Sequence, residues 1–242
     1  MKKTKKVKEV GETLVNFILD KSGSMESIKS ATISGFNEYI KTLKKDGNKY
    51  SFSLTMFDTQ IETPFINTPL NEVDELDEKK YDTNGSTALY DAVCSTIKKI
   101  KEKAGQKVIT IIMTDGEENS SKEYTQVQMR AMIQELEKKG NWTFVYLGAN
   151  QDSYANAQKF GIPTMNTTNF MATNAGMMKS MNVMAMNTSN FAMNASSNTN
   201  AFFSTSDQQN LAQDDDADKI HQHFSSMGKK SWDKKRKDIL NS

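Results

Sequence analysis

The chain is poor in cysteine and histidine, and each shortage excludes a class of protein. Its single cysteine, Cys94, cannot form an internal disulfide, so we expect a reducing compartment such as the cytoplasm rather than a secreted adhesion module. The only histidines, His221 and His223, lie in a polar C-terminal stretch and do not make a zinc site with Cys94. Because a G-x-S-x-G turn is also missing, a serine hydrolase is not expected.

Long apolar runs and an excess of one charge are missing as well. No apolar run reaches the length of a membrane span, and the lysine-rich start does not lead into a convincing signal peptide, so no membrane association is expected. Lys and Arg number 31 against 30 Asp and Glu, which gives no electrostatic reason to propose a nucleic acid as the main target. The basic ends, 2–8 and 229–237, do not change this expectation, because they lack interleaved stacking aromatics. Without a Walker-type or dinucleotide glycine loop, nucleotide binding has no support.

What the sequence does contain is an alternation of two periodic patterns over its first 160 residues. Near-continuous apolar or alternating runs predict buried strands, and apolar residues at three- and four-residue steps predict helices. Strands separated by helices imply an α/β fold with a mostly parallel sheet covered on both faces, whose ligands sit beyond the carboxyl ends of the strands. The expected strands are 13–19, 50–57, 60–65 as a hairpin partner, 107–114 and 142–147, and the expected helices are 27–45, 86–103, 123–139 and 152–160.

Composition changes after residue 165, where Asn, Met, Ser, Thr and Ala dominate. Met177, Met181, Met184, Thr188 and Phe191 nevertheless recur at helical spacing, which predicts a closing helix over about 171–200 that packs its methionine face on the sheet. A methionine-rich surface for partners and a disordered segment are the alternatives. The expected division of the chain is therefore a basic extension at 1–10, one domain at 11–205 and a charged tail at 206–242.

Five oxygen-bearing residues follow or precede the predicted elements in a pattern that suits a hard cation. Asp20, Ser22 and Ser24 alternate in a glycine-containing turn directly after the first strand, Thr87 lies at the start of the second helix, and Asp115 follows the strand 107–114. Alternation in a tight turn can direct three side chains toward one point, and Mg²⁺ binds about six oxygen ligands, some of them water. Mn²⁺ accepts the same ligands in the same geometry.

The five residues, D-x-S-x-S, T and D, resemble the complete metal-ion-dependent adhesion site of von Willebrand factor A domains. The surrounding sequence agrees: Asp-Lys-Ser-Gly-Ser-Met after the first strand, Gly-Ser-Thr-Ala-Leu opening a helix, and Thr-Asp-Gly-Glu after a hydrophobic strand. The resemblance implies a Rossmann-like, doubly wound sheet of six strands. It also implies that Ser22, Ser24 and Thr87 bind the metal directly, while Asp20 and Asp115 act through water and orient the hydroxyls. Single-domain, cytoplasmic versions encoded by bacteria and bacteriophages fit this chain best.

The function that follows from the resemblance is a binding module and not an enzyme. A metal held mostly by neutral oxygens keeps an open position for an outside anion, such as a Glu or Asp of a partner protein. A structural protein that self-assembles through the metal is one alternative, and a Mg²⁺-dependent phosphohydrolase is another, although Ser22 stands where such an enzyme needs a second acid. The simplest reading without a metal is that Ser24, Ser86 and Asp115 only cap helices.

The residues beside the five have simpler interpretations. Lys21, between two ligand positions, is expected to point into solvent. Glu117, Glu118 and Asn119 follow Asp115, and we expect them either to be solvated on a surface loop or to influence selectivity at the rim of the site.

Overall fold

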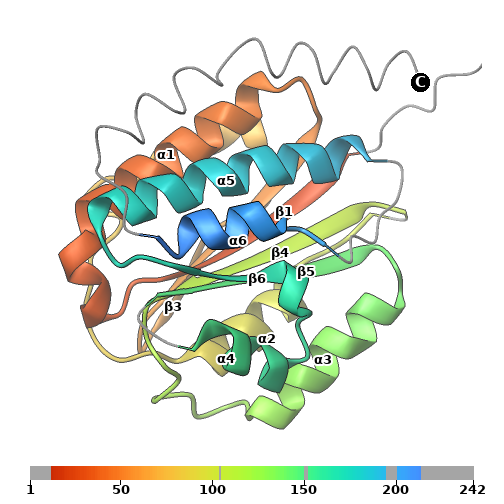
Figure 1. Ribbon diagram of the computed structural model, residues 1–242. Helices are drawn as coiled ribbons and strands as arrows, with labels where there is room; N and C mark the ends of the chain where they lie inside the picture. The colour runs from red at the N-terminus through yellow and green to blue at the C-terminus, as the bar shows by residue number, and fades with distance from the viewer. Residues whose placement is uncertain (1–11, 104, 150–151, 195–200, 214–242) are drawn as a thin grey trace, which may run out of the picture.

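The sheet at the centre of the molecule explains most of the sequence pattern. The structure is a computed structural model that describes residues 12–103, 105–149, 152–194 and 201–213. In this part of the chain six strands form one sheet in the order β3-β2-β1-β4-β5-β6, with only β3 antiparallel to its neighbour (Figure 1). The strands are β1 (Thr13–Asp20), β2 (Tyr50–Phe57), β3 (Ile61–Pro69), β4 (Lys107–Thr114), β5 (Trp142–Ala149) and β6 (Thr167–Phe170).

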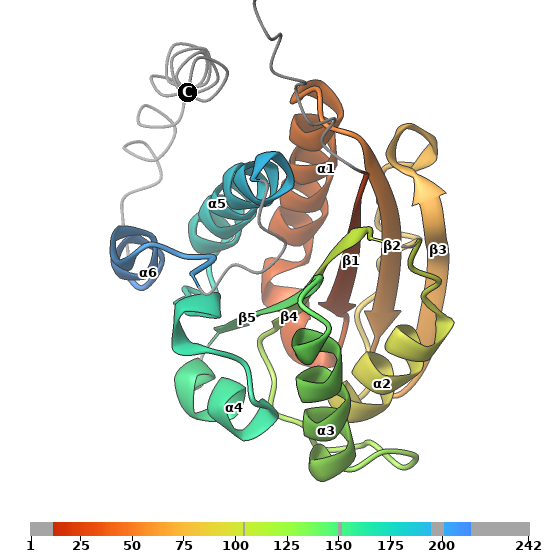
Figure 2. The same cartoon turned by 90° about the vertical axis from the view of Figure 1, so that its right-hand side faces the viewer.

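Helices cover both faces of this sheet, as expected for an α/β fold. Figure 2 shows α1 and α5 on one face and α2 and α3 on the other, and two separate clusters of buried apolar side chains fill the two interfaces. The doubly wound, mostly parallel six-stranded fold class is therefore confirmed. The helices are α1 (Lys29–Lys45), α2 (Leu89–Lys99), α3 (Gln126–Lys138), α4 (Ser153–Phe160), α5 (Asn174–Met193) and α6 (Thr205–Leu211), with short 3₁₀ turns η1 (Gly23–Ile28), η2 (Leu70–Glu72) and η3 (Thr164–Asn166).

The register of the central strands decides where the functional loops lie. Every residue of β1, β2, β4 and β5 is buried, because helices cover both faces of these strands. Leu19 of β1 pairs with Met113 of β4, so the next residues, Asp20 and Thr114, end the two strands side by side. Strand order reverses between β1 and β4, and this is where a doubly wound sheet opens a crevice for ligands.

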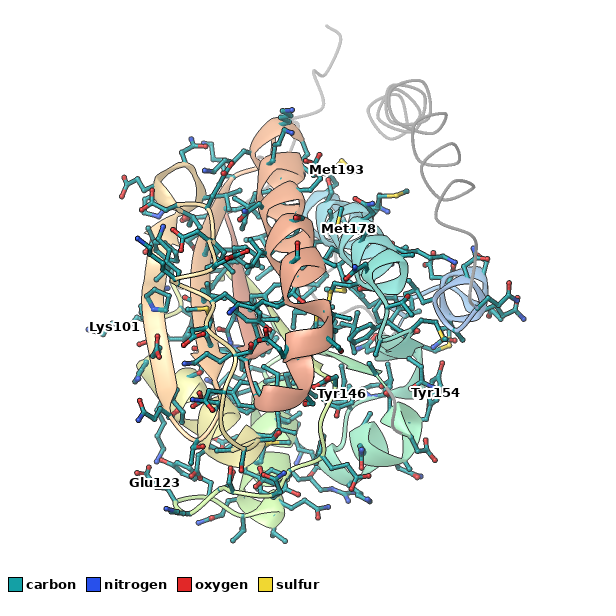
Figure 3. The ribbon with its side chains drawn as sticks, turned by 90° about the vertical axis from the view of Figure 1, so that its left-hand side faces the viewer. Lys101, Glu123, Tyr146, Tyr154, Met178 and Met193 are labelled. Atoms are coloured by element: carbon teal, nitrogen blue, oxygen red, sulfur yellow. The ribbon has the colours of Figure 1, made fainter. Side chains whose placement is uncertain are left out.

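The methionine-rich closing helix packs on the sheet as its spacing predicts. Met177, Met181, Met184 and Phe191 are buried in the same cluster as the side chains of α1, and α5 lies along α1 (Figure 2). Gly35 of α1 permits this contact, since a Cβ there would lie 2.8 Å from Met181 Cγ. Met178 and Met193 are also on α5, and Met178 is only partly buried against the core (Figure 3). The helix is shorter than the predicted 171–200, and residues 195–200 lie outside the described residues.

Several boundaries differ from the sequence prediction for local reasons. Strand β6 was not located, because its four residues, TTNF, carry no apolar run. Helix α2 ends at Lys99 instead of 103, since the backbone of Lys101 leaves the helix to exchange two hydrogen bonds with the side-chain amide of Asn67. At the C-terminal end, the expected boundary after residue 205 falls in the first turn of α6, whose Leu211 is buried in the core.

The proposed extension at 1–10 and most of the proposed tail, residues 214–242, lie outside the described residues. Within the described ranges, no helix combines the length and the hydropathy that crossing a membrane requires.

Candidate metal centre

Three loops meet at the carboxyl ends of β1 and β4. The first follows Asp20, the second precedes α2, and the third follows β4; Glu123 of the third loop marks this end of the molecule in Figure 3. Backbone hydrogen bonds join the first two loops: Gly23 N donates to Gly85 O over 3.2 Å, and Asn84 N donates to Lys21 O over 2.9 Å. Gly85 has φ +66°, a conformation that favours glycine. The chain therefore brings together loops that are far apart in sequence.

Three hydroxyls converge where these loops meet. Ser22 Oγ and Ser24 Oγ lie 3.1 Å apart. A Cβ placed on Gly116 would lie 2.8 Å from Thr87 Oγ1, 3.6 Å from Ser24 Oγ and 3.7 Å from Ser22 Oγ, so the three oxygens surround the point that glycine leaves free. We call these three hydroxyls with the space beside Gly116 the hydroxyl cradle. The structure thus brings together the three residues expected to bind the metal directly.

Two buried carboxylates support the hydroxyl cradle. Asp20 is fully buried, accepts a 2.7 Å bond from Ser22 N, and is hydrogen-bonded by the Thr114 hydroxyl. Asp115 is 8% exposed and accepts a 2.6 Å bond from Ser24 Oγ. Asp20 therefore holds the backbone of Ser22 and Asp115 holds the hydroxyl of Ser24, while their action on a metal through water stays a prediction.

The protonation of these carboxylates reflects their surroundings. Burial raises the pKa of the Asp20 carboxyl to about 6, against the opposing hydrogen bonds from Thr114 and Ser22 and with a further contribution from the negative charge of Asp115. Burial likewise raises the pKa of Asp115, although the hydrogen bond from Ser24 opposes the shift. Two carboxylates that are costly to ionise beside three hydroxyl oxygens form a site that a divalent cation would stabilise.

The donor set suits a hard cation better than a soft one. All five groups offer oxygen, which Mg²⁺ and Mn²⁺ prefer. Among the described residues there is no group of three or more His, Cys, Asp and Glu side chains that could hold a metal ion, so a site here relies on hydroxyls and water. Such a site fits a metal that keeps part of its hydration shell and presents an open position.

Tyr81 belongs to the supporting structure, although the sequence did not reveal it. Its side chain is fully buried, and its hydroxyl donates to the backbone oxygen of Asp20 over 2.5 Å. Burial raises the pKa of Tyr81, with the charges of Asp20 and Asp115 acting in the same direction, so this hydroxyl stays a donor. A tyrosine in an acid-rich, aperiodic stretch has no local pattern that would have marked it.

The expectation that Lys21 points into solvent was wrong. Lys21 is 7% exposed, and its ammonium lies 2.8 Å from Glu62 Oε1 and 3.4 Å from Asp58 Oδ2 on the β2–β3 hairpin. The first of these acids is half exposed, so the pair is screened, but the aliphatic stem of Lys21 is covered. Its side chain therefore anchors the first loop to the hairpin instead of extending into water.

Glu118 is not a free surface charge, and Asn119 binds backbone although its side chain is exposed. Glu118 accepts hydrogen bonds from the backbone N–H groups of Ser120, Ser121 and Tyr90 over 2.7 to 3.0 Å. Asn119 Oδ1 accepts from Thr87 N over 2.9 Å. Glu117 and Asn119 are exposed, and an influence of these residues on selectivity stays a prediction.

The capping interpretation of the motif does not hold. The N-cap of α2 is Ala88, and the N-cap of η1 is Ser22, whose side chain makes no capping bond. None of the described helices is capped by Ser24, Ser86 or Asp115. Helix capping therefore does not explain why these residues occur together.

Comparison with known proteins shows the family to which this fold belongs. Residues 15–214 match the von Willebrand factor type A domain. The chain belongs to this family. A search of curated proteins gave no significant match. The family match includes all three loops of the hydroxyl cradle and extends through α6.

Solved structures of proteins of different origin show the same fold. One from Catenulispora acidiphila is 18% identical, with a TM-score of 0.54 over 74% of this chain and 43% of that one. Proximal thread matrix protein 1 of the mussel byssus, in a form with a zinc-occupied adhesion-site motif, is 13% identical, with a TM-score of 0.56 over 74% of this chain and 46% of that one. The pilus adhesin SpaC of Lactobacillus rhamnosus GG is 14% identical, with a TM-score of 0.59 over 75% of this chain and 31% of that one. The present chain spans less than half the length of each.

Proposed function

We propose that this von Willebrand factor type A domain is a metal-dependent protein-interaction module. Ser22, Ser24 and Thr87 would hold Mg²⁺ directly, and Asp20 and Asp115 would act through water and through the hydroxyls that they orient. The observation that carries the proposal is the convergence of three hydroxyl oxygens around the space beside Gly116, with two buried carboxylates behind them. Mn²⁺ fits the same set of ligands.

The chemistry of the hydroxyl cradle selects the kind of ligand. Neutral hydroxyls donate little charge to the ion, so a bound Mg²⁺ would remain a good acceptor for an anionic oxygen at its open position. A Glu or Asp side chain of a partner protein supplies such an oxygen. The metal then acts as the recognition element, and the protein contributes the geometry.

Binding is a better account of the site than catalysis. A phosphohydrolase on this type of sheet needs an acid that protonates the leaving group, and the position two residues after Asp20 is Ser22, whose hydroxyl is 3.1 Å from Ser24 Oγ. The chain's two histidines, His221 and His223, lie outside the described residues and outside the family match. We also propose a cytoplasmic setting, in a bacterial cell or a phage-infected host, because the only cysteine is a buried thiol of α2.

Affinity capture with the immobilised full chain tests the proposal. Capture is compared in Mg²⁺ and in EDTA, and with Thr87→Ala, using Ser86→Ala as the matched control because Ser86 is the exposed neighbour of Thr87. We expect a partner that is retained in Mg²⁺ by the wild type and by Ser86→Ala, is lost in EDTA and with Thr87→Ala, and is lost when one of its own acids is neutralised. Equal recovery in EDTA would contradict metal-dependent binding, and turnover of a phosphate ester that disappears with Asp20→Asn would favour the enzyme.

A further inference from the structure

The start of α2 is stabilised from another loop instead of by its own cap. Its N-cap residue, Ala88, has no side-chain capping bond. The N–H groups at this helix start bind side chains that lie 28 to 32 residues later in the chain: Thr87 N donates to Asn119 Oδ1 over 2.9 Å, Tyr90 N to Glu118 Oε2 over 3.0 Å, and Asp91 N to Ser121 Oγ over 3.1 Å. We call these three acceptors, Glu118, Asn119 and Ser121, the 118–121 clamp.

The clamp holds itself together as well. Glu118 Oε1 accepts from the backbone N–H groups of Ser120 and Ser121 over 2.9 and 2.7 Å, and Glu118 Oε2 also accepts from Ser121 Oγ over 2.7 Å. Asp91 of α2 also binds the loop: its carboxylate accepts from the N–H groups of residues 122–124 over 2.7 to 3.0 Å. The loop after Asp115 and the helix after Thr87 are therefore joined by bonds in both directions.

Asn119 is the member of the clamp that contacts a residue of the hydroxyl cradle. It accepts from the N–H of Thr87, and its own N–H donates to Thr87 O over 3.0 Å, so both backbone polar groups of Thr87 bind the same residue. Ser120 N adds a second bond to Thr87 O over 3.2 Å. Thr87 is almost fully buried, and these bonds hold the backbone that carries its Oγ1 beside Gly116.

From this arrangement we infer that Asn119 is a positioning residue for metal binding, and that the 118–121 clamp sets the metal affinity by fixing Thr87 relative to Asp115. The inference rests on the proposed metal site, and it assigns to Asn119 no contact with the ion. Without the clamp, binding of the metal would have to order the loop of Thr87 and the loop of Asp115. The free energy of that ordering would weaken the affinity for the metal. Outer residues that orient ligands typically change metal affinity about 10- to 100-fold.

Calorimetric titration of the full chain with Mg²⁺ or Mn²⁺ tests the role of Asn119. Asn119→Ala is expected to weaken binding at least about tenfold, whereas Asn119→Asp, which keeps the acceptor oxygen, should bind at least as tightly as the wild type. The matched control is Asn37→Ala, since Asn37 bonds to both backbone groups of Leu76 over 2.8 and 2.9 Å, outside the three metal loops. It should leave the affinity unchanged.

Hydrogen exchange in the metal-free wild type gives a second readout that does not depend on any variant folding. The Thr87 amide should already be protected in EDTA, because its acceptor is Asn119 and not a group ordered by metal. Unchanged affinity in Asn119→Ala, or a Thr87 amide that is protected only after metal is added, would overturn the positioning role and leave the metal site intact. If the wild type binds neither ion while Thr87 is protected, the metal site itself is wrong and the positioning role is overturned with it.

Discussion

Buried charged side chains lie at both ends of the central sheet, but their hydrogen-bond partners differ. At the amino end, Lys107 of β4 is 9% exposed, and its ammonium donates to the backbone oxygens of Phe191, Ala192 and Asn194 over 2.7 to 2.8 Å at the end of α5. Burial lowers the pKa of Lys107 to about 8, and the three oxygens accept from the ammonium that still predominates at neutral pH. At the carboxyl end, the donors to Asp20 and Asp115 within the described part of the chain are hydroxyl and backbone N–H groups.

The difference separates a charge with a structural role from the carboxylates that we propose to act in metal binding. The Lys107 ammonium has one acceptor for each of its three hydrogens, so the fold satisfies it. Lys21, which follows Asp20 in the sequence, pairs with Asp58 and Glu62 on the hairpin. No ion pair to Asp20 or Asp115 is present among the described residues, and the cation that we propose for the hydroxyl cradle would balance their charge.

Of the changes predicted here, removing the charge of Lys107 at the amino end of the sheet should lower the free energy of unfolding the most. Lys107→Met keeps the apolar stem but leaves three carbonyls at the end of α5 without their donor, so we expect a loss of about 3 kcal/mol in the free energy of unfolding. Urea denaturation measures this loss. Lys41→Met is the control, because Lys41 forms only an exposed i,i+3 pair with Glu38, and it should cost less than about 0.5 kcal/mol. Equal losses in the two variants would show that Lys107 is not the anchor of α5.

The pH dependence of the free energy of unfolding should reveal the buried carboxylate of Asp20 at the carboxyl end of the sheet. The pKa of Asp20 is about 6 in the folded protein, above its ordinary value of 3.8, so the folded state binds this proton more tightly than the unfolded state. The contribution of Asp20 is therefore greatest below about pH 4 and is lost as the pH rises to about 6. In EDTA, the wild type should lose about 2 kcal/mol relative to Asp20→Asn over this window. Parallel profiles for the two proteins would contradict the burial of an unbalanced carboxylate.

A methyl group in the hydroxyl cradle should weaken metal binding, because Thr87 Oγ1 has to move to make room for it. In Gly116→Ala the new methyl group lies 2.8 Å from Thr87 Oγ1, within the space that the three hydroxyls surround, and Mg²⁺ affinity should fall at least about tenfold. Gly23→Ala is the matched control in the same site, since a Cβ there makes only an ordinary 3.5 Å contact with Gly85 O. Calorimetric titration distinguishes them, and equal affinities would place the metal elsewhere.

The sequence predicted the parts of this molecule that depend on local pattern. Period-two and period-3.6 runs located five of the strands and the methionine face of α5, because burial on a strand or helix imposes its spacing on the sequence. The five residues of the motif were found for a related reason: Asp20, Ser22 and Ser24 share one turn, and each motif element stands beside a predicted strand or helix.

Features that depend on contacts between distant segments could not be predicted. The direction of Lys21 depends on a hairpin 37 to 41 residues away, since its partners are Asp58 and Glu62. Tyr81 and the 118–121 clamp bind backbone atoms of other loops, and a single sequence carries no record of such pairs. Strand β6 is four residues long and is defined by pairing with β5 rather than by composition.

Calorimetric titration of the full chain with Mg²⁺ at neutral pH tests the central claim most directly. The wild type should bind one ion and gain thermal stability, by about 2.7 kcal/mol when free Mg²⁺ is a hundred times the dissociation constant. Thr87→Ala, which removes one of the three hydroxyls, should lose both the binding and the stabilisation. A wild-type protein that takes up no ion from Mg²⁺ or Mn²⁺, or a Thr87→Ala variant that binds as tightly as the wild type, would contradict the account.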